Sequence, residues 1–444
     1  MFDAILIANR GEIARRVMRT ARALAVRTVA VYSDADAGAL HVREADEAVR
    51  IGPPPPQESY LDGDAIIAAA RATGAQAIHP GYGFLSESPE FADAVHKAGL
   101  VWIGPPSDAI AAVGEKVQAR NLMAAAGVPV ARGTSAPVGS VEQALDAAEE
   151  IGYPVMVKAA AGGGGIGMRV ARDPGELRKA FETTSGQAER FFSSSAVLLE
   201  QYLPGARHVE VQIFGLADGR IIALGERDCS VQRRYQKVFE ETPSPGVDDS
   251  LRERMLDAAV RAGERIGYRS AGTVECLVAD GEFVFLEVNA RLQVEHPVTE
   301  LVTGIDLVAE QLRVAAGEPP GFDPDAVRGS GHAVELRIYA EDPVRFLPSP
   351  GRITAWRPPS GEGIRLDAGY AEGDEVTPFY DPLLAKLCAW GPERATALDR
   401  AAQAAETFVI DGPKTNLAFH RELLADPGLR SGDYDTGIIE RMRG

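Results

Sequence analysis

The stretch YPVMVKAAAGGGGIGMRVA at residues 153–171 places a run of glycines between two apolar segments. A Rossmann fingerprint needs a helix after its glycines and a Walker A loop ends in Gly-Lys-Ser/Thr, so this stretch is neither. Strand, glycines and strand predict a flexible hairpin whose backbone amides can close over phosphates. Lys158 would then reach phosphate oxygens. The alternative interpretation is an ordinary glycine hairpin with an exposed lysine.

The segments around this hairpin predict two kinds of architecture. The first hundred residues alternate between apolar strands and amphipathic helices, which predicts a parallel sheet with ligands at its turns. The expected strands are 4–9, 27–33, 75–81 and 100–105, with helices at 12–25, 62–74 and 88–99. After about residue 204 extended segments dominate, with helices near 250–266, 305–316 and 395–407. The chain is therefore predicted to be α/β and α+β.

Composition excludes several functional classes. The chain has 444 residues, 45% of them hydrophobic and 25% charged, as expected for a globular enzyme of about three subdomains. A net charge of −18 argues against a nucleic-acid partner. Apolar runs stay below the roughly 20 residues of a membrane span, and the start lacks the pattern of a secretory signal. Three scattered cysteines indicate a reducing compartment, so a cytoplasmic location is expected.

The segment FVFLEVNARLQVEHPVTE, residues 283–300, is the most informative about chemistry. Side chains of a strand alternate between its faces, so one face is predicted to carry Glu287, Asn289, Arg291, Gln293 and Glu295. The alternative is a solvated polar face of a half-buried strand. The apolar start FVFL, which suits a strand buried on both sides, favours a functional row.

This row suits a metal and an oxyanion. Carboxylate and amide oxygens suit Mg²⁺, and Glu275 in the neighbouring predicted strand could supply a second carboxylate. Arg291 and Gln293 could hold a small planar oxyanion, and Glu295 could act as a base toward it. By contrast, the cationic segment GERDCSVQRRYQKVFEETPSP, residues 225–245, is by itself typical of a solvated face. His208 is by itself typical of a sheet histidine.

Several segments together resemble biotin carboxylases of the ATP-grasp superfamily, in the same order along the chain. They are HPGYGFLSE (79–87), KAAAGGGGIGMR (158–169), RHVEVQIF (207–214), GERDCSVQRR (225–234) with QK (236–237), FLEVNARLQVEHPVTE (285–300), GHAVELR (331–337) and FLPSPG (346–351). The resemblance implies a Rossmann-like domain at 1–113, an ATP-grasp region at 114–316 with a mobile lid at about 130–203, and a mixed β domain at 317–444.

The resemblance also implies roles for individual residues. Lys116 and Lys158 would contact the ATP phosphates under a lid loop containing Gly164 and Gly165. Adenine and ribose would lie against Glu200, Gln201, Leu203, Leu277, His208 and Gln232. Mg²⁺ or Mn²⁺ would be held by Glu275, Glu287 and Asn289. Bicarbonate would be held by Lys237, Arg291, Gln293 and the backbone of Val294.

The remaining implied roles concern catalysis and biotin. Glu295 resembles the general base, and Arg337 the residue that stabilises the biotin enolate, with Tyr82 and Asp381 beside the biotin ring. Two positions depart from the family pattern: Ile166 replaces a common lid cation, and Tyr235 replaces a common histidine. Both could change the affinity for ATP.

The implied activity is ATP- and bicarbonate-dependent carboxylation of biotin through carboxyphosphate, the first half-reaction of an acetyl- or acyl-CoA carboxylase. Because the sequence has no Met-Lys-Met biotinylation motif, the biotin is expected on a separate carrier protein or on a region beyond residue 444. The other implied partners are a second copy of the chain, forming a homodimer, and a carboxyltransferase subunit. Two alternatives are an ATP-grasp ligase with a different acceptor and a nucleotide-binding regulatory protein without turnover.

Overall fold

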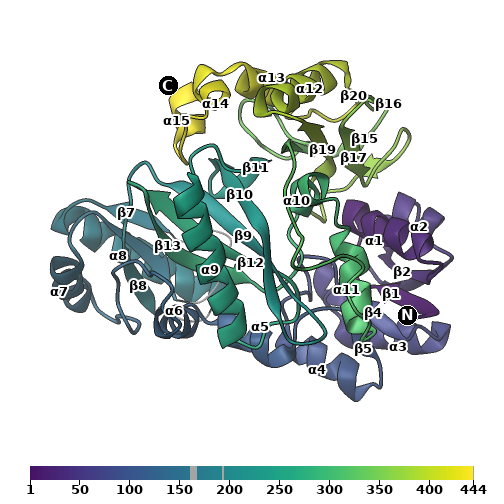
Figure 1. Cartoon of the computed structure of the whole chain (residues 1–444), viewed down its shortest axis with the longest axis horizontal. Coiled ribbons are helices and arrows are strands. Elements are labelled where there is room, and N and C mark those ends of the chain that lie inside the picture. Colours follow the sequence, from purple (N-terminus) through teal and green to yellow (C-terminus); the bar gives the residue numbers. More distant parts are fainter. Residues whose placement is uncertain (161–167, 193–194, 444) are drawn as a thin grey trace.

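The computed structural model describes residues 1–160, 168–192 and 195–443. Its N-terminal part is a five-stranded parallel sheet of order β3-β2-β1-β4-β5 (Figure 1). The strands are β1 (Ala4–Ile7), β2 (Arg27–Ser33), β3 (Glu47–Gly52), β4 (Ala77–His79) and β5 (Val101–Trp102). The helices are α1 (Gly11–Ala23), α2 (Leu40–Glu44), α3 (Gly63–Thr73), α4 (Pro89–Lys97) and α5 (Ser107–Gly114). The predicted alternation of strands and helices is confirmed, although β3, α2 and α5 were not predicted.

A smaller unit follows on the left of Figure 1. Three antiparallel strands of order β7-β6-β8 form its sheet, and apolar side chains of α7 and α8 pack against them. The elements are α6 (Lys116–Ala125), α7 (Val141–Ile151), β6 (Val155–Ala159), β7 (Arg169–Ala171), α8 (Pro174–Phe192) and β8 (Val197–Gln201). The predicted strands on either side of the glycine run are therefore confirmed.

An eight-stranded antiparallel sheet of order β13-β12-β9-β10-β11-β14-β19-β17 forms the centre of the molecule. Its strands are β9 (Arg207–Gly215), β10 (Ile221–Arg233), β11 (Gln236–Thr242), β12 (Ser270–Ala279), β13 (Glu282–Asn289), β14 (His332–Tyr339), β17 (Ile364–Ala368) and β19 (Leu383–Gly391). Because β11 pairs with β14, this sheet continues across the division predicted at residue 316, which stays a prediction.

Helices and small ladders complete the second half of the chain. In Figure 1, α9 crosses one face of β9 and β10, and α12 and α13 lie at the top near the C-terminus. The helices are α9 (Asp249–Arg265), α10 (His296–Thr303), α11 (Leu307–Ala315), α12 (Arg394–Thr407), α13 (Leu417–Ala425), α14 (Pro427–Ser431) and α15 (Ile438–Arg443). The short strands are β15 (Gly351–Arg352), β16 (Ala355–Arg357), β18 (Glu375–Val376) and β20 (Val409–Asp411).

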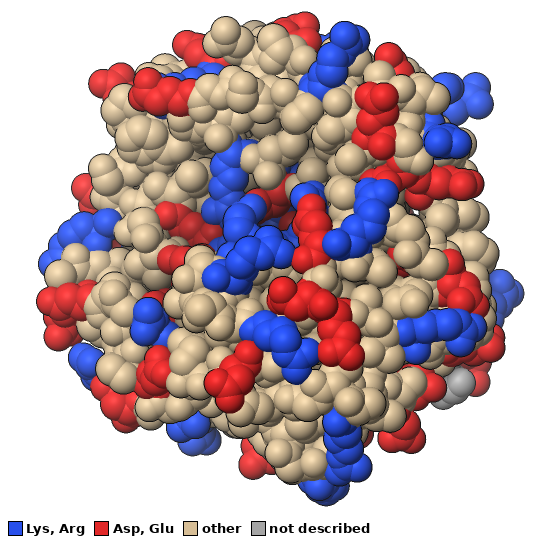
Figure 2. Space-filling view, turned by 90° about the vertical axis from the view of Figure 1, so that its right-hand side faces the viewer, with Lys and Arg blue, Asp and Glu red and all other residues tan. Residues whose placement is uncertain are grey.

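The surface carries charges of both signs. Figure 2 shows acidic and basic side chains interspersed over one face, with basic side chains gathered around a central hollow. Among the described residues, no helix is long and apolar enough to cross a membrane.

Candidate active site

A row of charged residues crosses four neighbouring strands of the central sheet. Arg227 on β10 pairs with Glu210 on β9, Glu210 pairs with Glu275 on β12, and Glu275 pairs with Glu287 on β13. Directly paired residues project from the same face of a sheet, so three carboxylates and one guanidinium share one surface. Arg227 and Glu210 are fully buried, and the Arg227 Nε donates to Glu210 Oε1 at 2.6 Å.

Lys237 on β11 joins this row to Glu295. Its Nζ donates to Glu210 Oε2 at 2.6 Å, to Glu275 Oε1 at 2.8 Å and to Glu295 Oε1 at 2.7 Å. Burial by itself would lower the pKa of Lys237, but the three carboxylates raise it well above its ordinary value. The ammonium therefore stays charged and holds three strands and the Glu295 segment together.

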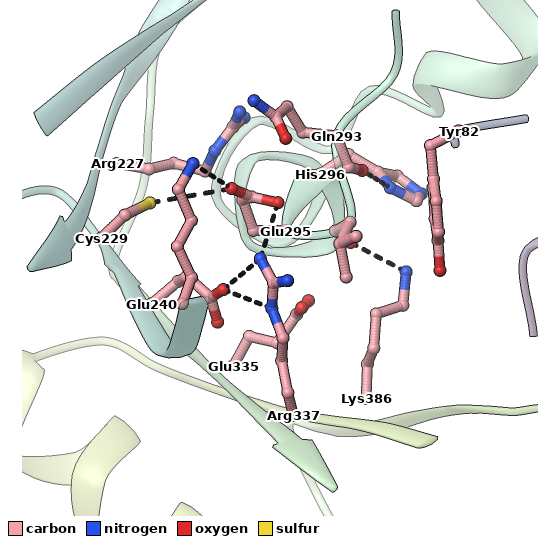
Figure 3. Close-up of polar contacts among 12 residues, drawn as sticks. Tyr82, Arg227, Cys229, Glu240, Gln293, Glu295, His296, Glu335, Arg337 and Lys386 are labelled. Atoms are coloured by element: carbon pink, nitrogen blue, oxygen red, sulfur yellow. Dashed lines mark hydrogen bonds and ion pairs between the residues drawn. The ribbon is translucent and has the colours of Figure 1, made fainter. Parts of the chain in front are cut away.

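Glu295 is fully buried between two cations. Its second oxygen lies 3.0 Å from Arg337 Nη2, and Arg337 Nε donates to Glu240 Oε1 at 2.6 Å (Figure 3). Burial alone would raise the pKa of Glu295, but Lys237, Arg337 and Arg227 lower it below its ordinary 4.5. The carboxylate is thus fully ionised when no anion is bound.

The segment after Asn289 differs from the prediction. Strand β13 ends at Asn289, residues 290–295 are irregular, and Glu295 immediately precedes α10, so the prediction of one alternating strand is wrong beyond Asn289. The amide of Ala290, the first residue after β13, donates to the Glu87 carboxylate at 3.1 Å instead of to a neighbouring strand, so the ladder does not continue into this segment.

Hydrogen bonds nevertheless bring the predicted side chains together. Asn289 Nδ2 and Gln293 Nε2 donate to Glu275 Oε1 at 2.9 and 3.1 Å. Arg291 donates to Asn289 Oδ1 at 2.9 Å and to Gln293 Oε1 at 3.0 Å. The row therefore forms one cluster through the folded loop rather than through strand alternation.

Two further corrections concern residues that the sequence alone interpreted as ordinary. The cationic segment 225–245 is not a solvated face throughout, because Arg227 is fully buried and the side chain of Lys237 is only 11% exposed. His208 is not an isolated sheet histidine. Its Nε2 lies 2.8 Å from Glu275 Oε2, and its Nδ1 accepts from Gln232 Nε2 at 2.7 Å. Burial would lower the pKa of His208, but Glu275 raises it overall.

The chain matches three family models in succession. They are "Biotin carboxylase, N-terminal domain" over residues 1–110, "Carbamoyl-phosphate synthase L chain, ATP binding domain" over 115–320, and "Biotin carboxylase C-terminal domain" over 335–441. A biotin carboxylase of Halalkalibacterium halodurans is 50% identical over 441 residues, which cover 99% of this chain and 97% of the relative. The chain belongs to the biotin carboxylase family.

Other relatives and solved structures agree with this family. The propionyl-CoA carboxylase alpha chain of Ruegeria pomeroyi is 48% identical over 462 residues, covering 99% of this chain and 68% of that one. The Campylobacter jejuni biotin carboxylase complex with beta-gamma-ATP superposes with a TM-score of 0.97 at 41% identity and 99% coverage of both chains. The biotin carboxylase domain dimer of Hydrogenobacter thermophilus 2-oxoglutarate carboxylase, in complex with MgADP, ADP and bicarbonate, gives 0.96 at 43% identity, covering 99% and 98%. The biotin carboxylase fold, predicted as ATP-grasp, is therefore confirmed.

Three of the residues that the resemblance to biotin carboxylases assigned to ATP form one charged group. Lys158 on β6 forms an ion pair with Glu200 on β8, and both interact electrostatically with Lys116 at the start of α6. Lys116 also interacts electrostatically with Glu287, and burial lowers the pKa of Lys116. Gln201 accepts from Arg132 Nε at 3.2 Å.

The other residues assigned to ATP, or to its affinity, are half-buried, exposed or outside the described residues. Leu277 pairs with His208 across β12 and β9 and is half-buried, as is Leu203 just beyond β8. Gly164, Gly165 and Ile166 lie outside the described residues. Tyr235 is 47% exposed in the turn between β10 and β11. The contacts of these residues with ATP stay predictions.

The residues assigned to biotin meet near Arg337. Tyr82 and Asp381 both interact electrostatically with Arg337, and burial raises the pKa of each. The Tyr82 hydroxyl donates to the Glu12 carboxylate rather than pointing freely outward. Their contact with biotin stays a prediction.

Glu275, Glu287 and Asn289 fit a divalent cation. The two carboxylates face each other across β12 and β13, and burial together with the Glu275 charge raises the pKa of Glu287. A divalent cation would relieve this repulsion with the oxygen ligands that Mg²⁺ or Mn²⁺ takes. His208, Glu210 and Glu275 form a second compact group able to hold a metal ion.

Sequence reasoning missed Glu210, Glu87 and Glu240. Glu210 could have been found, because the period-two pattern of HVEVQIF places it on the same face as His208. Glu87 accepts from Arg291 Nε at 2.9 Å and from the Ala290 amide at 3.1 Å, and only the folded chain brings it there. Glu240 pairs with Arg337 through the β11–β14 register, for the same reason.

Proposed function

We propose that this chain uses ATP and bicarbonate to carboxylate biotin on a carrier protein, the first half-reaction of a biotin-dependent carboxylase. The observation that carries the proposal is Glu295, a buried carboxylate fixed between Lys237 and Arg337 and connected through Lys237 to the Glu275–Glu287 row. A base, two cations and a metal-competent carboxylate pair are the groups that activation of bicarbonate by ATP requires.

In the first step, bicarbonate enters between Arg291, Gln293 and Lys237. Glu295 removes the bicarbonate proton, the freed oxygen attacks the γ-phosphorus of ATP, and ADP leaves to give carboxyphosphate. Lys237 and Arg291 stabilise the charge on the transferring oxygens. A bound Mg²⁺ or Mn²⁺ would neutralise charge on the ATP phosphates.

Ion-pair exchange would activate Glu295. Its lowered pKa makes it a weak base while Lys237 and Arg337 are both bound to it. An anion that takes over the Lys237 ammonium removes part of this stabilisation and raises the pKa of Glu295. Arrival of bicarbonate therefore prepares the base that deprotonates it.

In the second step, carboxyphosphate breaks down to CO₂ and phosphate. The phosphate takes the proton from the biotin ureido nitrogen, Arg337 stabilises the enolate oxygen, and the nitrogen attacks CO₂. Closure of the lid excludes water, which would otherwise hydrolyse carboxyphosphate. Hydrogen bonds to Glu295 and Glu240 hold the Arg337 guanidinium beside the proposed base.

The proposed partners are a biotin carboxyl carrier protein or domain, a second copy of the chain and a carboxyltransferase subunit. A relative named as a carboxylase alpha chain and one described as a dimer support this assignment. A cytoplasmic location is proposed from the three buried cysteines, all of which are free.

The test is ADP release with free biotin, measured with and without bicarbonate. We expect ADP release to require bicarbonate and to rise with biotin. Glu295→Ala and Arg291→Ala should abolish bicarbonate-dependent ATP cleavage, because they remove the base and an oxyanion-binding cation, while nucleotide binding persists. Normal turnover of either variant would refute the site, and bicarbonate-independent turnover of the wild type would refute the function.

A further inference from the structure

Lys386 is a buried cation beside the active site that takes no part in the two proposed steps. It lies on β19, its side chain has no exposed surface, and its Nζ donates to the carbonyl oxygen of Val294 at 2.9 Å. Figure 3 shows it reaching the loop of Glu295 from a strand next to that of Arg337. The residue that receives this bond directly precedes the proposed base.

The same ammonium lies 3.2 Å from Glu12 Oε1 on α1. Glu12 is 4% exposed and also accepts the Tyr82 hydroxyl. Lys386 therefore joins three distant parts of the chain: the parallel sheet unit through Glu12, the site loop through Val294, and the C-terminal strands through its own backbone. Asp367 contributes further negative charge around it, and the Glu335 carboxyl group also lies close to the ammonium.

The bond to Val294 is one of two side-chain hydrogen bonds that hold the backbone just before Glu295. The preceding carbonyl, that of Gln293, accepts from His296 Nδ1 at 2.7 Å. Burial and nearby cations lower the pKa of His296 well below its ordinary value, so the ring is neutral and Nδ1 carries the donated proton. Both carbonyls before Glu295 are thus held by side chains, one from α10 and one from β19.

Holding the Val294 carbonyl fixes the peptide plane between Val294 and Glu295, because the peptide unit is rigid. The direction in which the Glu295 side chain leaves the backbone follows from that plane. Its oxygens then meet Lys237 and Arg337 at 2.7 and 3.0 Å. A displacement of about 1 Å at such a group can lower a rate about 100-fold.

A purely structural ion pair is the competing explanation. A buried pair is weak support for stability, because desolvation of both charges offsets much of their attraction. Lys386 also gives one donor to a backbone carbonyl of the site loop rather than to a carboxylate alone. The two explanations therefore predict different results for removing Lys386 and for removing Glu12.

We propose that Lys386 is a positioning residue for Glu295, which it holds in its catalytic orientation through the Val294 carbonyl. The proposal rests on the proposed function, since it concerns the base of that reaction. The Glu12 ion pair contributes to the stability of this region, whereas the bond to Val294 carries the effect on rate.

The experiment measures bicarbonate-dependent ADP release by Lys386→Met and Glu12→Gln. Lys386→Met keeps the side-chain volume and removes the donor. We expect its kcat to fall about 10- to 100-fold with an unchanged KM for ATP. Glu12→Gln keeps Lys386 as donor and an oxygen acceptor for Tyr82. It should lower the melting temperature and retain kcat near that of the wild type.

The controls separate positioning from folding. Lys414→Met removes an exposed lysine paired with Asp342 and should leave kcat unchanged. If Lys386→Met does not fold, the double variant with Glu12→Gln removes both charges together, and the same loss of kcat is expected of it. A kcat near that of the wild type in either folded Lys386 variant, or an equal loss in Glu12→Gln, would overturn the proposal. A wild type without bicarbonate-dependent ADP release would instead refute the proposed function.

Discussion

The protonation state of single residues in this site depends on the balance of buried charge. Lys237 meets three carboxylates, whereas Glu240 and Glu335 face each other across β11 and β14 with Arg337 paired to only one of them. One oxygen of each carboxylate is buried without a hydrogen-bond partner among the described residues. Burial raises the pKa of Glu240 to about 7 and that of Glu335 well above 4.5. Glu335 therefore keeps a proton that the unfolded chain would release.

Glu335→Gln should remove a pH dependence of stability. Because the folded protein holds the Glu335 proton above pH 4.5 and the unfolded chain does not, the wild type loses stability as pH rises from 4.5 toward the folded pKa. The variant should gain about 1.4 kcal/mol relative to the wild type per pH unit in this window. Melting temperatures from about pH 5 upward measure the difference, and the exposed Glu372→Gln is the control. Parallel curves for wild type and Glu335→Gln would contradict the assignment.

Among the secondary-structure elements, the β12–β13 hairpin places the Glu275 and Glu287 carboxylates, which could hold a divalent cation, opposite each other. Its two-residue turn is Asp280-Gly281, with φ of 53° and 73°, and Ala279 pairs with Glu282 on either side. Asp-Gly is a preferred sequence for such a turn, because both residues need positive φ. The register that starts at this turn ends with Glu275 opposite Glu287, despite a bulge after Glu275.

Gly281→Ala should destabilise the hairpin by about 1 kcal/mol, because an added Cβ disfavours positive φ. No atom lies within 4 Å of the position that this Cβ would occupy, so the cost is conformational and not steric. Thermal unfolding measures it. Gly281→Asn is the matched control, since asparagine tolerates this conformation, and it should lose less stability than the alanine variant. Equal losses in both variants would contradict the explanation.

In the molecule as a whole, Glu300 joins the N-terminal sheet unit to the C-terminal strands. It is 7% exposed, and its oxygens lie 2.6 Å from Arg16 Nη2 on α1 and 2.7 Å from Arg365 Nη1 on β17. Arg16 also reaches Asp306 just before α11. The N-terminal sheet unit is thus held to the C-terminal strands by a buried charge network.

Glu300→Ala should lower the free energy of unfolding by about 3 kcal/mol, because it leaves one buried and one half-buried arginine without this partner. Arg43→Gln breaks a more exposed pair, with Asp374, between the same two parts of the chain and should cost less than about 1 kcal/mol. Calorimetry of both variants provides the comparison. A smaller loss of unfolding free energy in Glu300→Ala than in Arg43→Gln would show that the Glu300 network does not hold the N-terminal unit to the C-terminal strands.

Local elements and the chemical character of the site could be predicted from the amino-acid sequence. Helix and strand periodicities predicted β2 at its observed bounds and α3 to within one residue at each end, and the order of acids, amides and cations from Glu287 to Glu295 indicated the chemistry. Such patterns are local, so they survive without knowledge of the fold.

The contacts between these groups depend on how distant segments fold together. Strand β13 ends before Arg291, so alternation alone would have misplaced Gln293 and Glu295. Lys237 reaches Glu295 because β11, β10, β9 and β12 are neighbours in one sheet, and Lys386 reaches Val294 from a distant strand, β19. Contacts between such distant segments depend on sheet order and register, which no periodicity within a segment encodes.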